Sequence, residues 1–437
     1  MKISLINHGC AKNLVDAELM LGLLDSKGYE ITLDEGEADI VIVNTCSFIH
    51  DAERESIQSI LQMIENGKKV IVTGCLAQKY SDELKEEIPE LAGMIGTSDI
   101  NELDKVIVAL ANNNEYKSIV NKEPKYVYPE NITRQQITVG ASSYIKIGDG
   151  CNYRCGYCII PKLRGNYVSR PIENIVKEAN ELVNKGVTEI ILIAQDTSSY
   201  GIDLYNKQAL PQLLAELNKI ENLSWIRILY AYPTQMTDEL IDSIANLDKV
   251  VKYVDIPLQH SHPEVLKRMK RPVMDYKELV QKIRNKIPNV SIRTSLIVGY
   301  PGETEEEFEH LYNFVKDVKF DRMGVFEYCR EEGTYSDTLD NHIEEDVKKE
   351  RKDKLMLLQQ KISLENNEKY VGKIIDCIVE GYTDDGVVIL RSEHDAPEID
   401  GLVYAKNDSD INIVPGDILS VEITKAQEYD LFGIIME

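Results

Sequence analysis

The sequence lacks the features that would place the protein in a membrane or send it out of the cell. It has no uninterrupted stretch of about 18 apolar residues, which a membrane-spanning helix needs. Its first residues, MKISLINHGC, contain no basic segment followed by an apolar run, as a secretion signal would. We therefore expect a cytoplasmic protein with no membrane partner. Thiols stay reduced there, so cysteines should be buried residues or ligands of metals and clusters rather than disulfides.

Basic charge is also scarce. The 437 residues include 49 Lys and Arg against 74 Asp and Glu, which gives a net charge of −25. Such a surface repels the phosphates of nucleic acids and attracts basic proteins. The apolar content of 43% and the charged content of 28% are those of a globular protein with well-formed cores. The length suggests about three domains.

Short apolar segments alternate with helical patterns in the first part of the chain. Strands are predicted at KISLIN, ADIVIVNT and KKVIVTG, and each is followed by a helix, the second from about Phe48 to Glu65. Alternation of this kind predicts a doubly wound parallel α/β domain over residues 1–112. A polar stretch over residues 113–136 is predicted to be a linker.

Two further domains are expected after this linker. Residues 137–368 contain six strand-like segments separated by helical ones, beginning at SYIKIGDG, which predicts an open, partial (β/α)6 barrel rather than a closed barrel of eight. Residues 369–437 change to short β segments with turns, which predicts a small antiparallel β-barrel of OB-like type. From residue 371 onward this last domain holds 4 basic and 15 acidic residues, a net charge of −11.

The densest group of cysteines has no fourth ligand. GCNYRCGYCIIP places Cys151, Cys155 and Cys158 in a loop after the first barrel strand, and no Cys or His follows before His260. Cysteines are often buried apolar residues, but a glycine-bearing loop is a poor place to bury three thiols. Structural zinc would need an unseen fourth ligand. An iron–sulfur cube with one open iron needs none, and that iron could bind a substrate.

This motif, C-x3-C-x2-C with Tyr157 before the last cysteine, resembles the signature of radical S-adenosylmethionine enzymes. The resemblance implies that Cys151, Cys155 and Cys158 are catalytic and hold a 4Fe-4S cluster whose fourth iron binds S-adenosylmethionine. Reduction by a low-potential electron donor would then give a 5′-deoxyadenosyl radical, which removes hydrogen from an unactivated carbon. The barrel would position these groups and exclude water.

Other positions fit contacts to S-adenosylmethionine. SLIVGYPGE, with Ser295 and Gly299, is similar to the strand end that packs beside the adenine in this superfamily, although a plain strand and Pro-Gly turn would read the same way. Gln195, in AQD at the end of the second predicted barrel strand, is a candidate for binding the methionyl group of S-adenosylmethionine. Arg170 and Arg293 are candidates for its carboxylate, with surface ion pairs as the alternative for both.

Three more cysteines occupy equivalent places in the first domain. Cys10, Cys46 and Cys75 follow the strands ISLIN, DIVIVNT and KVIVTG. Each alone would be taken as a buried cysteine. Because parallel strands end at one edge of a sheet, the three together predict a second cluster site there. Cys329 and Cys377 do not belong to a comparable group of cysteines and are expected to be structural.

The combination of these three domains resembles the methylthiotransferases over essentially the whole chain. That resemblance implies two 4Fe-4S clusters, the auxiliary one on Cys10, Cys46 and Cys75, and names the last domain a TRAM domain. One S-adenosylmethionine would supply the radical and another the methyl group, so that C–H becomes C–S–CH3. A non-catalytic iron–sulfur carrier would explain the cysteines but not the barrel, and a zinc module would hold zinc instead.

Two substrates compete within this family. One branch modifies the β-carbon of an aspartate in the small-subunit ribosomal protein S-twelve, and the other an N6-modified adenosine of transfer RNA. AQDTSSYGIDLY, DIPLQHSH and HDAPEIDG resemble the first branch. An acidic last domain also suits a basic ribosomal protein better than RNA, so transfer RNA is the less favoured partner. Tyr382, Tyr404, Tyr429 and Phe432 could stack on bases, but they are better explained as the core of a small barrel.

Overall fold

The computed structural model describes residues 1–47, 50–113, 116–129, 132–137, 140–407 and 412–436. The chain divides into two compact units. Unit 1 comprises Met1–Val139, Gly148–Tyr153 and Ile159–Arg170, and unit 2 comprises Gly140–Ile147, Arg154–Cys158 and Pro171–Glu437. The three-cysteine loop therefore contributes Cys151 to unit 1 and Cys155 and Cys158 to unit 2. In the described part of the chain, no helix is long and apolar enough to cross a membrane.

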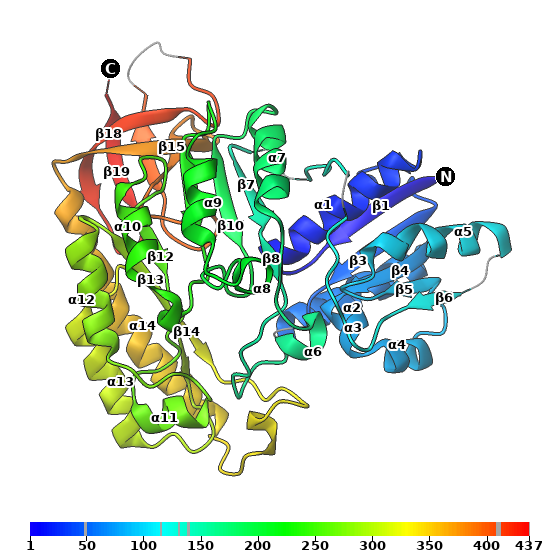
Figure 1. The fold of residues 1–437 in the computed structure, drawn as a ribbon, viewed down its shortest axis with the longest axis horizontal. Helices are drawn as coiled ribbons and strands as arrows, with labels where there is room; N and C mark the ends of the chain where they lie inside the picture. Colours follow the sequence, from blue (N-terminus) through cyan, green and yellow to red (C-terminus); the bar gives the residue numbers. More distant parts are fainter. Residues whose placement is uncertain (48–49, 114–115, 130–131, 138–139, 408–411, 437) are drawn as a thin grey trace. The chain divides into compact units, whose positions relative to one another are not determined.

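A parallel sheet forms the core of unit 1 (Figure 1). Within the described residues its strand order is β2-β1-β3-β4-β5-β6, and all neighbours pair in parallel. The strands are β1 (Lys2–Asn7), β2 (Glu30–Ile31), β3 (Ile40–Thr45), β4 (Lys69–Gly74), β5 (Gly93–Ile95) and β6 (Lys117–Ile119). This arrangement confirms the doubly wound prediction. β6 lies in the segment predicted as a linker and joins the sheet as its edge strand.

Helices cover both faces of this sheet. They are α1 (Ala11–Ser26), α2 (His50–Glu65), α3 (Cys75–Lys79), α4 (Ser81–Glu87) and α5 (Leu103–Asn113). Successive strand residues point to opposite faces: Ile42 packs in the core with α1 and α5, and its neighbour Val43 packs with α2, α3 and α4. Burial on both faces explains why the strands read as continuous apolar runs. Phe48, the predicted start of the second helix, lies outside the described residues.

Parallel strands of unit 2 form the predicted partial barrel. They are β7 (Ser142–Lys146), β10 (Glu189–Ile193), β11 (Trp225–Ile228), β12 (Tyr253–Asp255), β13 (Ser291–Val298) and β14 (Arg322–Glu327). Their orders in the described residues are β11-β10-β7 and β12-β13-β14, with β11 and β12 in contact. All six predicted strand segments are confirmed.

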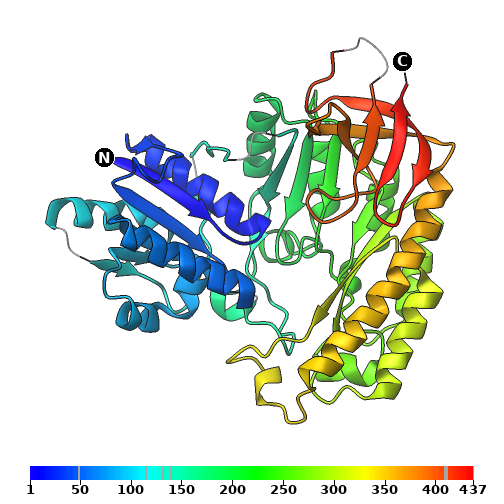
Figure 2. The ribbon, with the colours of Figure 1, turned by 180° about the vertical axis from the view of Figure 1, so that it is seen from behind.

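Helices connect these strands (Figures 1 and 2). They are α7 (Ile172–Val183), α8 (Ile202–Tyr205), α9 (Leu210–Leu217), α10 (Asp238–Asn246), α11 (Pro263–Arg268), α12 (Tyr276–Lys286) and α13 (Glu305–Val318). The long α14 (Glu345–Asn367) packs against α13 and β14 and leads into the last domain (Figure 2). In unit 1, β8 (Gly148–Asp149) and β9 (Val168–Ser169) pair around α6 (Ile160–Arg164).

The last domain is a closed barrel, as predicted. Its strands are β15 (Ile374–Tyr382), β16 (Val388–Ser392), β17 (Val403–Lys406), β18 (Ile418–Ala426) and β19 (Leu431–Ile435). In the described residues they close in the order β15-β16-β17-β19-β18. Four pairings are antiparallel, and the fifth, between β17 and β19, is parallel. Cys377 is fully buried in the barrel's apolar core, which fits the structural role expected for it.

Buried ion pairs attach this barrel to the first residues of the strands of the (β/α) barrel. Glu189, which begins β10, accepts a hydrogen bond from Arg227 Nε at 2.8 Å and from the Arg391 guanidinium of β16. Arg322, which begins β14, pairs with Asp395, and the Tyr253 hydroxyl donates to Asp400 at 2.6 Å. The segment HDAPEIDG, noted in the sequence, therefore supplies carboxylates that hold the two barrels of unit 2 together.

Candidate active site

The three-cysteine loop is fixed by backbone hydrogen bonds on both of its halves. In unit 1, Cys151 N donates to the Gly165 carbonyl at 3.1 Å. In unit 2, Cys158 N donates to the Cys155 carbonyl at 3.1 Å, and Gly156 N donates to the Met269 carbonyl at 2.7 Å. All three cysteines are partly exposed, so a cofactor could reach their sulfurs.

A buried cation faces one of these sulfurs. Arg271 Nη1 lies 4.0 Å from Cys155 Sγ, and its Nη2 donates to the Pro257 carbonyl. The Arg271 guanidinium also lies over the Tyr232 ring, 4.3 Å from its centroid. Thiolates that ligate iron carry negative charge, so a buried guanidinium beside Cys155 suits a cluster in this loop.

Tyr157, the aromatic residue of the motif, lies close enough to Cys155 and Cys158 for both thiols to affect its hydroxyl. Burial raises the pKa of the Tyr157 hydroxyl well above its usual value, and the Cys155 thiol raises it further. Tyr157 also packs against the buried Tyr300 and Tyr328. Its ring therefore lies between the cysteine loop and the apolar residues of unit 2.

The predicted adenine-side turn is tight and internally bonded. Gly299, with φ +72°, donates from its N–H to both carboxylate oxygens of Glu303 at 3.1 Å. A Cβ on Gly299 would lie 2.3 Å from Lys348 Cγ, so glycine is required there. Glu303 also binds Arg351 at 2.7 Å and lies 3.5 Å from His260 Nε2. Ser295 lies on β13, the strand that ends just before Gly299, and its carbonyl accepts a hydrogen bond from Gln259 N at 2.8 Å.

The remaining candidates for S-adenosylmethionine have different surroundings. Gln195 follows β10 and is half-buried next to Asp196, whose carboxylate accepts from the Ser198 N–H at 3.0 Å. Arg293 is paired with Asp255 at 3.3 Å and Asp400 at 3.5 Å. In unit 1, the Arg170 guanidinium lies 3.3 Å from the centroid of the Tyr128 ring. Both guanidinium groups thus already have partners within the protein.

The three N-terminal cysteines lie at one edge of the unit 1 sheet. Cys10 precedes α1, Cys46 follows β3 directly, and Cys75 begins α3 directly after β4. Desolvation raises the pKa of Cys75 to about 11, to which the nearby thiols of Cys10 and Cys46 contribute. Burial also raises the pKa of Cys10, but Lys12 and Arg164 lower it by more, so the net shift is downward.

Two glycines make room for this convergence. A Cβ on Gly9, with φ +108°, would lie 3.0 Å from Cys46 Cβ. A Cβ on Gly74, with φ +90°, would lie 2.4 Å from the Thr45 carbonyl oxygen. The residues before Cys10 and Cys75 therefore approach the end of β3 more closely than any side chain would permit. This close approach suits a cofactor shared by three strand ends.

No group of three His, Cys, Asp or Glu side chains in the described ranges is compact enough to hold one metal ion. A cube with its ligands on separate irons does not require so compact a group. Cys329 is exposed and contacts the Arg330 carbonyl.

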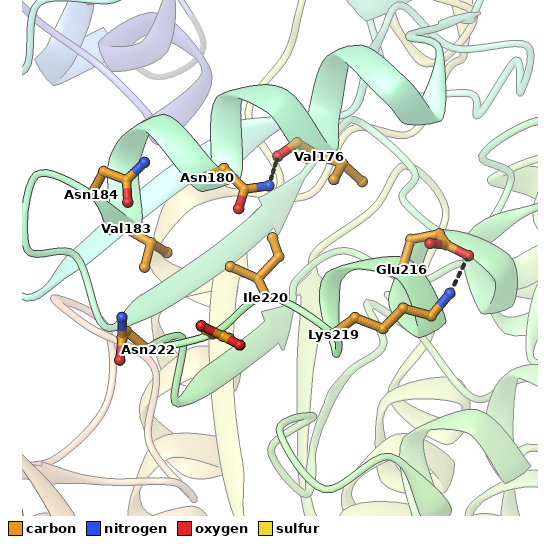
Figure 3. A pocket seen from close by; sticks show the side chains of 9 residues that line it. Val176, Asn180, Val183, Asn184, Glu216, Lys219, Ile220 and Asn222 are labelled. Atoms are coloured by element: carbon orange, nitrogen blue, oxygen red, sulfur yellow. Dashed lines mark hydrogen bonds and ion pairs between the residues drawn. The ribbon is translucent and has the colours of Figure 1, made fainter.

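A separate pocket of about 430 Å³ lies outside this region (Figure 3). It is a shallow depression between α7 and the end of α9, where Lys219 pairs with Glu216 at 2.8 Å. None of the residues lining it is a predicted site residue, so we assign it no function.

Sequence reasoning missed the charged residues around the cysteines. Arg271 and Arg164 face candidate ligands, but each is far in sequence from at least one residue that it contacts. Glu303 lies in SLIVGYPGE and His260 in DIPLQHSH, but the sequence alone assigned no role to either residue. The only available signal was basic residues in otherwise apolar surroundings, and that does not reveal a partner.

Family models match three successive segments of the chain. Residues 2–96 match the Uncharacterized protein family UPF0004, residues 145–315 the Radical SAM superfamily and residues 371–436 the TRAM domain. Among solved structures, the radical S-adenosylmethionine methyltransferase TsrM from Kitasatospora setae has a TM-score of 0.57 at 16% identity, covering 75% of this chain and 74% of that chain. At that identity the similarity concerns the fold alone.

Curated relatives match along their full length. The ribosomal protein uS12 methylthiotransferase RimO of Clostridioides difficile (strain 630) is 47% identical, with 100% of this chain and 99% of the relative covered. The protein of that name from Caldanaerobacter subterraneus subsp. tengcongensis is 50% identical, with 99% of each covered. With such identity across all three domains, this chain belongs to the RimO methylthiotransferase family.

Proposed function

We propose that this protein is a radical S-adenosylmethionine methylthiotransferase that converts C–H to C–S–CH3 at the β-carbon of an aspartate in ribosomal protein uS12, the S-twelve protein named above. The observation that carries the proposal is the presence of two cysteine triads, one in the barrel loop and one at a sheet edge. When bound, two 4Fe-4S clusters and S-adenosylmethionine supply the radical, sulfur and methyl chemistry of this reaction.

We assign the binding of the two clusters and of S-adenosylmethionine to separate groups of residues. Cys151, Cys155 and Cys158 would hold one cluster, and Cys10, Cys46 and Cys75 the other. Tyr157 would exclude water from the first cluster, and the Gly299 turn, with Ser295 on its strand, would hold S-adenosylmethionine. Gln195 remains our candidate for the methionyl group. Arg293 is a weaker candidate because two carboxylates already neutralise it.

We assign these roles to three domains. Residues 1–112 would carry the auxiliary cluster, residues 137–368 the radical chemistry, and residues 369–437 the TRAM barrel, with 113–136 as the connection. We propose that the reaction takes place in the cytoplasm, because its substrate is a ribosomal protein, and that a low-potential electron donor supplies the electron.

The charge of the TRAM barrel supports a protein substrate. From residue 371 onward there are 4 basic and 15 acidic residues. Arg391 is buried against Glu189 and Glu380, and Asp395 and Asp400 are buried as well, so three lysines and at most 13 carboxylates of this segment remain for a partner. Such a surface attracts a basic ribosomal protein and repels transfer RNA.

Turnover decides between the two substrates. The reconstituted enzyme is incubated with S-adenosylmethionine, a reductant and either ribosomal protein uS12 or transfer RNA, and mass spectrometry looks for the addition of one CH2S unit. We expect the addition on an aspartate of uS12. An addition on adenosine alone would refute the substrate assignment.

The cluster assignment has its own test. Replacing Cys10, Cys46 and Cys75 together by alanine should halve the iron content after anaerobic reconstitution. An unchanged iron content would refute the auxiliary site. Replacing only the exposed Cys329 by alanine is the matched control and should leave the iron content unchanged.

A further inference from the structure

Arg164, at the end of α6, is a buried cation at the centre of a polar network in unit 1. Its Nη1 donates to Asp149 at 2.8 Å and to Asp16 at 3.0 Å, and its Nη2 donates to Asn13 Oδ1 at 2.7 Å. The side chains of Arg164, Asp16 and Asp149 are each at most 5% exposed. Solvent therefore screens these interactions very little.

One half of this network belongs to the auxiliary triad. Asn13 and Asp16 lie on α1, which starts directly after Cys10. Asn13 Nδ2 donates to the His8 carbonyl at 3.2 Å and to the Thr45 carbonyl at 2.9 Å. Asn13 is thus bonded to the chain just before Cys10 and just before Cys46.

The other half belongs to the barrel loop. Asp149 stands two residues before Cys151, and its Oδ1 accepts a hydrogen bond from Gly150 N at 2.9 Å. Cys151 N in turn donates to Gly165, the residue after Arg164. Neither glycine could be replaced, because a Cβ on Gly150 would lie 2.2 Å from the Asn166 carbonyl oxygen and one on Gly165 would lie 2.0 Å from that of Pro124.

The guanidinium group suits this bridging role. Its donors are held in one plane at fixed directions, so three acceptors on two segments of the chain determine its position and it determines theirs. A lysine would supply the charge at one point only.

We propose that Arg164 is a positioning residue shared by the two cluster sites, which fixes the segment carrying Cys151 against the segments carrying Cys10 and Cys46. The inference rests on the proposed function, because it assumes a cluster on each triad. Arg164 joins the two segments directly through its hydrogen bonds to Asp149 on one side and to Asn13 and Asp16 on the other. Its role is to fix the position of Cys151, a ligand of the radical-generating cluster, relative to Cys10 and Cys46, ligands of the auxiliary cluster.

The test compares Arg164→Lys with the unmodified enzyme after both are reconstituted anaerobically. Iron content and release of 5′-deoxyadenosine from S-adenosylmethionine report whether each cluster forms and whether the radical step works. Two further readouts report the position of the two clusters relative to each other. They are the amount of methylthiolated product per 5′-deoxyadenosine and the magnetic interaction between the two reduced clusters in electron paramagnetic resonance. We expect iron and 5′-deoxyadenosine release within about twofold, a fall of about tenfold or more in product per 5′-deoxyadenosine, and an altered magnetic interaction.

Unchanged product per 5′-deoxyadenosine together with an unchanged magnetic interaction would overturn the proposal. If Arg164→Lys fails to retain iron, Asp16→Asn, which keeps the shape of the side chain on the α1 side, replaces it in the same assay. Loss of iron in that variant too would also overturn the proposal, since the network would then serve cluster assembly alone. The magnetic measurement needs no substrate, so it still tests the inference if uS12 proves not to be modified.

Discussion

The guanidinium of Arg271 and the sulfur of Cys155 lie 4.0 Å apart, and within the described chain no carboxylate is in ion-pair distance of that guanidinium. Charged side chains are seldom buried without a counter-charge. Once Cys155 ligates iron, its sulfur and the cluster behind it supply the missing negative charge. Arg271 would therefore belong to the electrostatic surroundings of the cluster that we propose on Cys151, Cys155 and Cys158.

This relationship predicts the direction of a redox shift. Reduction adds negative charge to the cluster, and a nearby buried cation stabilises the reduced form. Arg271→Gln should therefore lower the midpoint potential of the cluster, while Arg271→Lys should shift it less because the charge remains. A redox titration followed by electron paramagnetic resonance measures both, in a background without Cys10, Cys46 and Cys75. Equal potentials for the glutamine variant and the parent would contradict this role.

Glu189 should be essential for the stability of unit 2. It is completely buried, and its pKa is about 2, because Arg391 and Arg227 outweigh the effect of burial. Glu189→Gln would leave the buried Arg227 guanidinium without a charged partner and Arg391 with Glu380 alone, at a cost of about 3–5 kcal/mol in the free energy of unfolding. Urea denaturation measures the change. Glu216→Gln removes a similar pair at the surface, with Lys219, and is the matched control that should show almost no effect.

The pKa of Glu189 also predicts behaviour in acid. Its unfolded value is 4.5, and the folded value is lower, so the unfolded state binds the proton more tightly. The stabilisation from Glu189 is complete above about pH 4.5 and is lost as the pH falls toward 2.

His260 predicts a second pH dependence in a different range. Burial lowers its pKa below 6.5, more than Glu303 raises it, so the ring is neutral in the folded protein. The unfolded state takes up a proton first as the pH falls, so the contribution of His260 to stability is present above about pH 6.5 and declines below it. His260→Gln should flatten the dependence of the unfolding free energy on pH between about 6.5 and 5. A slope that matches the parent would show that His260 does not titrate there.

Gly74 should be required for the auxiliary cluster. A side chain there would collide with the backbone of Thr45 at the end of β3 and would push Cys75 away from Cys46. Gly74→Ala should therefore reduce the iron content toward that of a single cluster. Gly28→Ala is the matched control, because Gly28 also has a positive φ, +82°, but nothing lies within 4 Å of its added Cβ. Full iron content in Gly74→Ala would refute the close-approach argument.

Local sequence was sufficient to predict the main strands and the places of the cysteines after them, but not the edge strand β6, which lies in the segment predicted as a linker. Strand segments such as EIILI are buried on both faces and read as apolar runs, and Cys46 and Cys75 directly follow such runs. The contacts that give the sites their electrostatics could not be predicted in this way. Arg164 meets Asp16 across 148 residues, and the parallel pairing of β17 with β19 joins strands that are not neighbours in the chain. Such contacts depend on tertiary packing, which local sequence patterns do not encode.

The buried pairs between the two barrels of unit 2 also bear on the order in which the protein folds. Glu189 and Arg391 are separated by 202 residues. Contacts between segments so distant in the chain are slow to form, because most of the loop entropy is lost before the contact is made. Until the last domain has been synthesised and has folded, Arg322 at the start of β14 therefore lacks Asp395, and Glu189 at the start of β10 has only Arg227 as its partner. We expect the chain to be more prone to aggregation during that interval than after the last domain has docked.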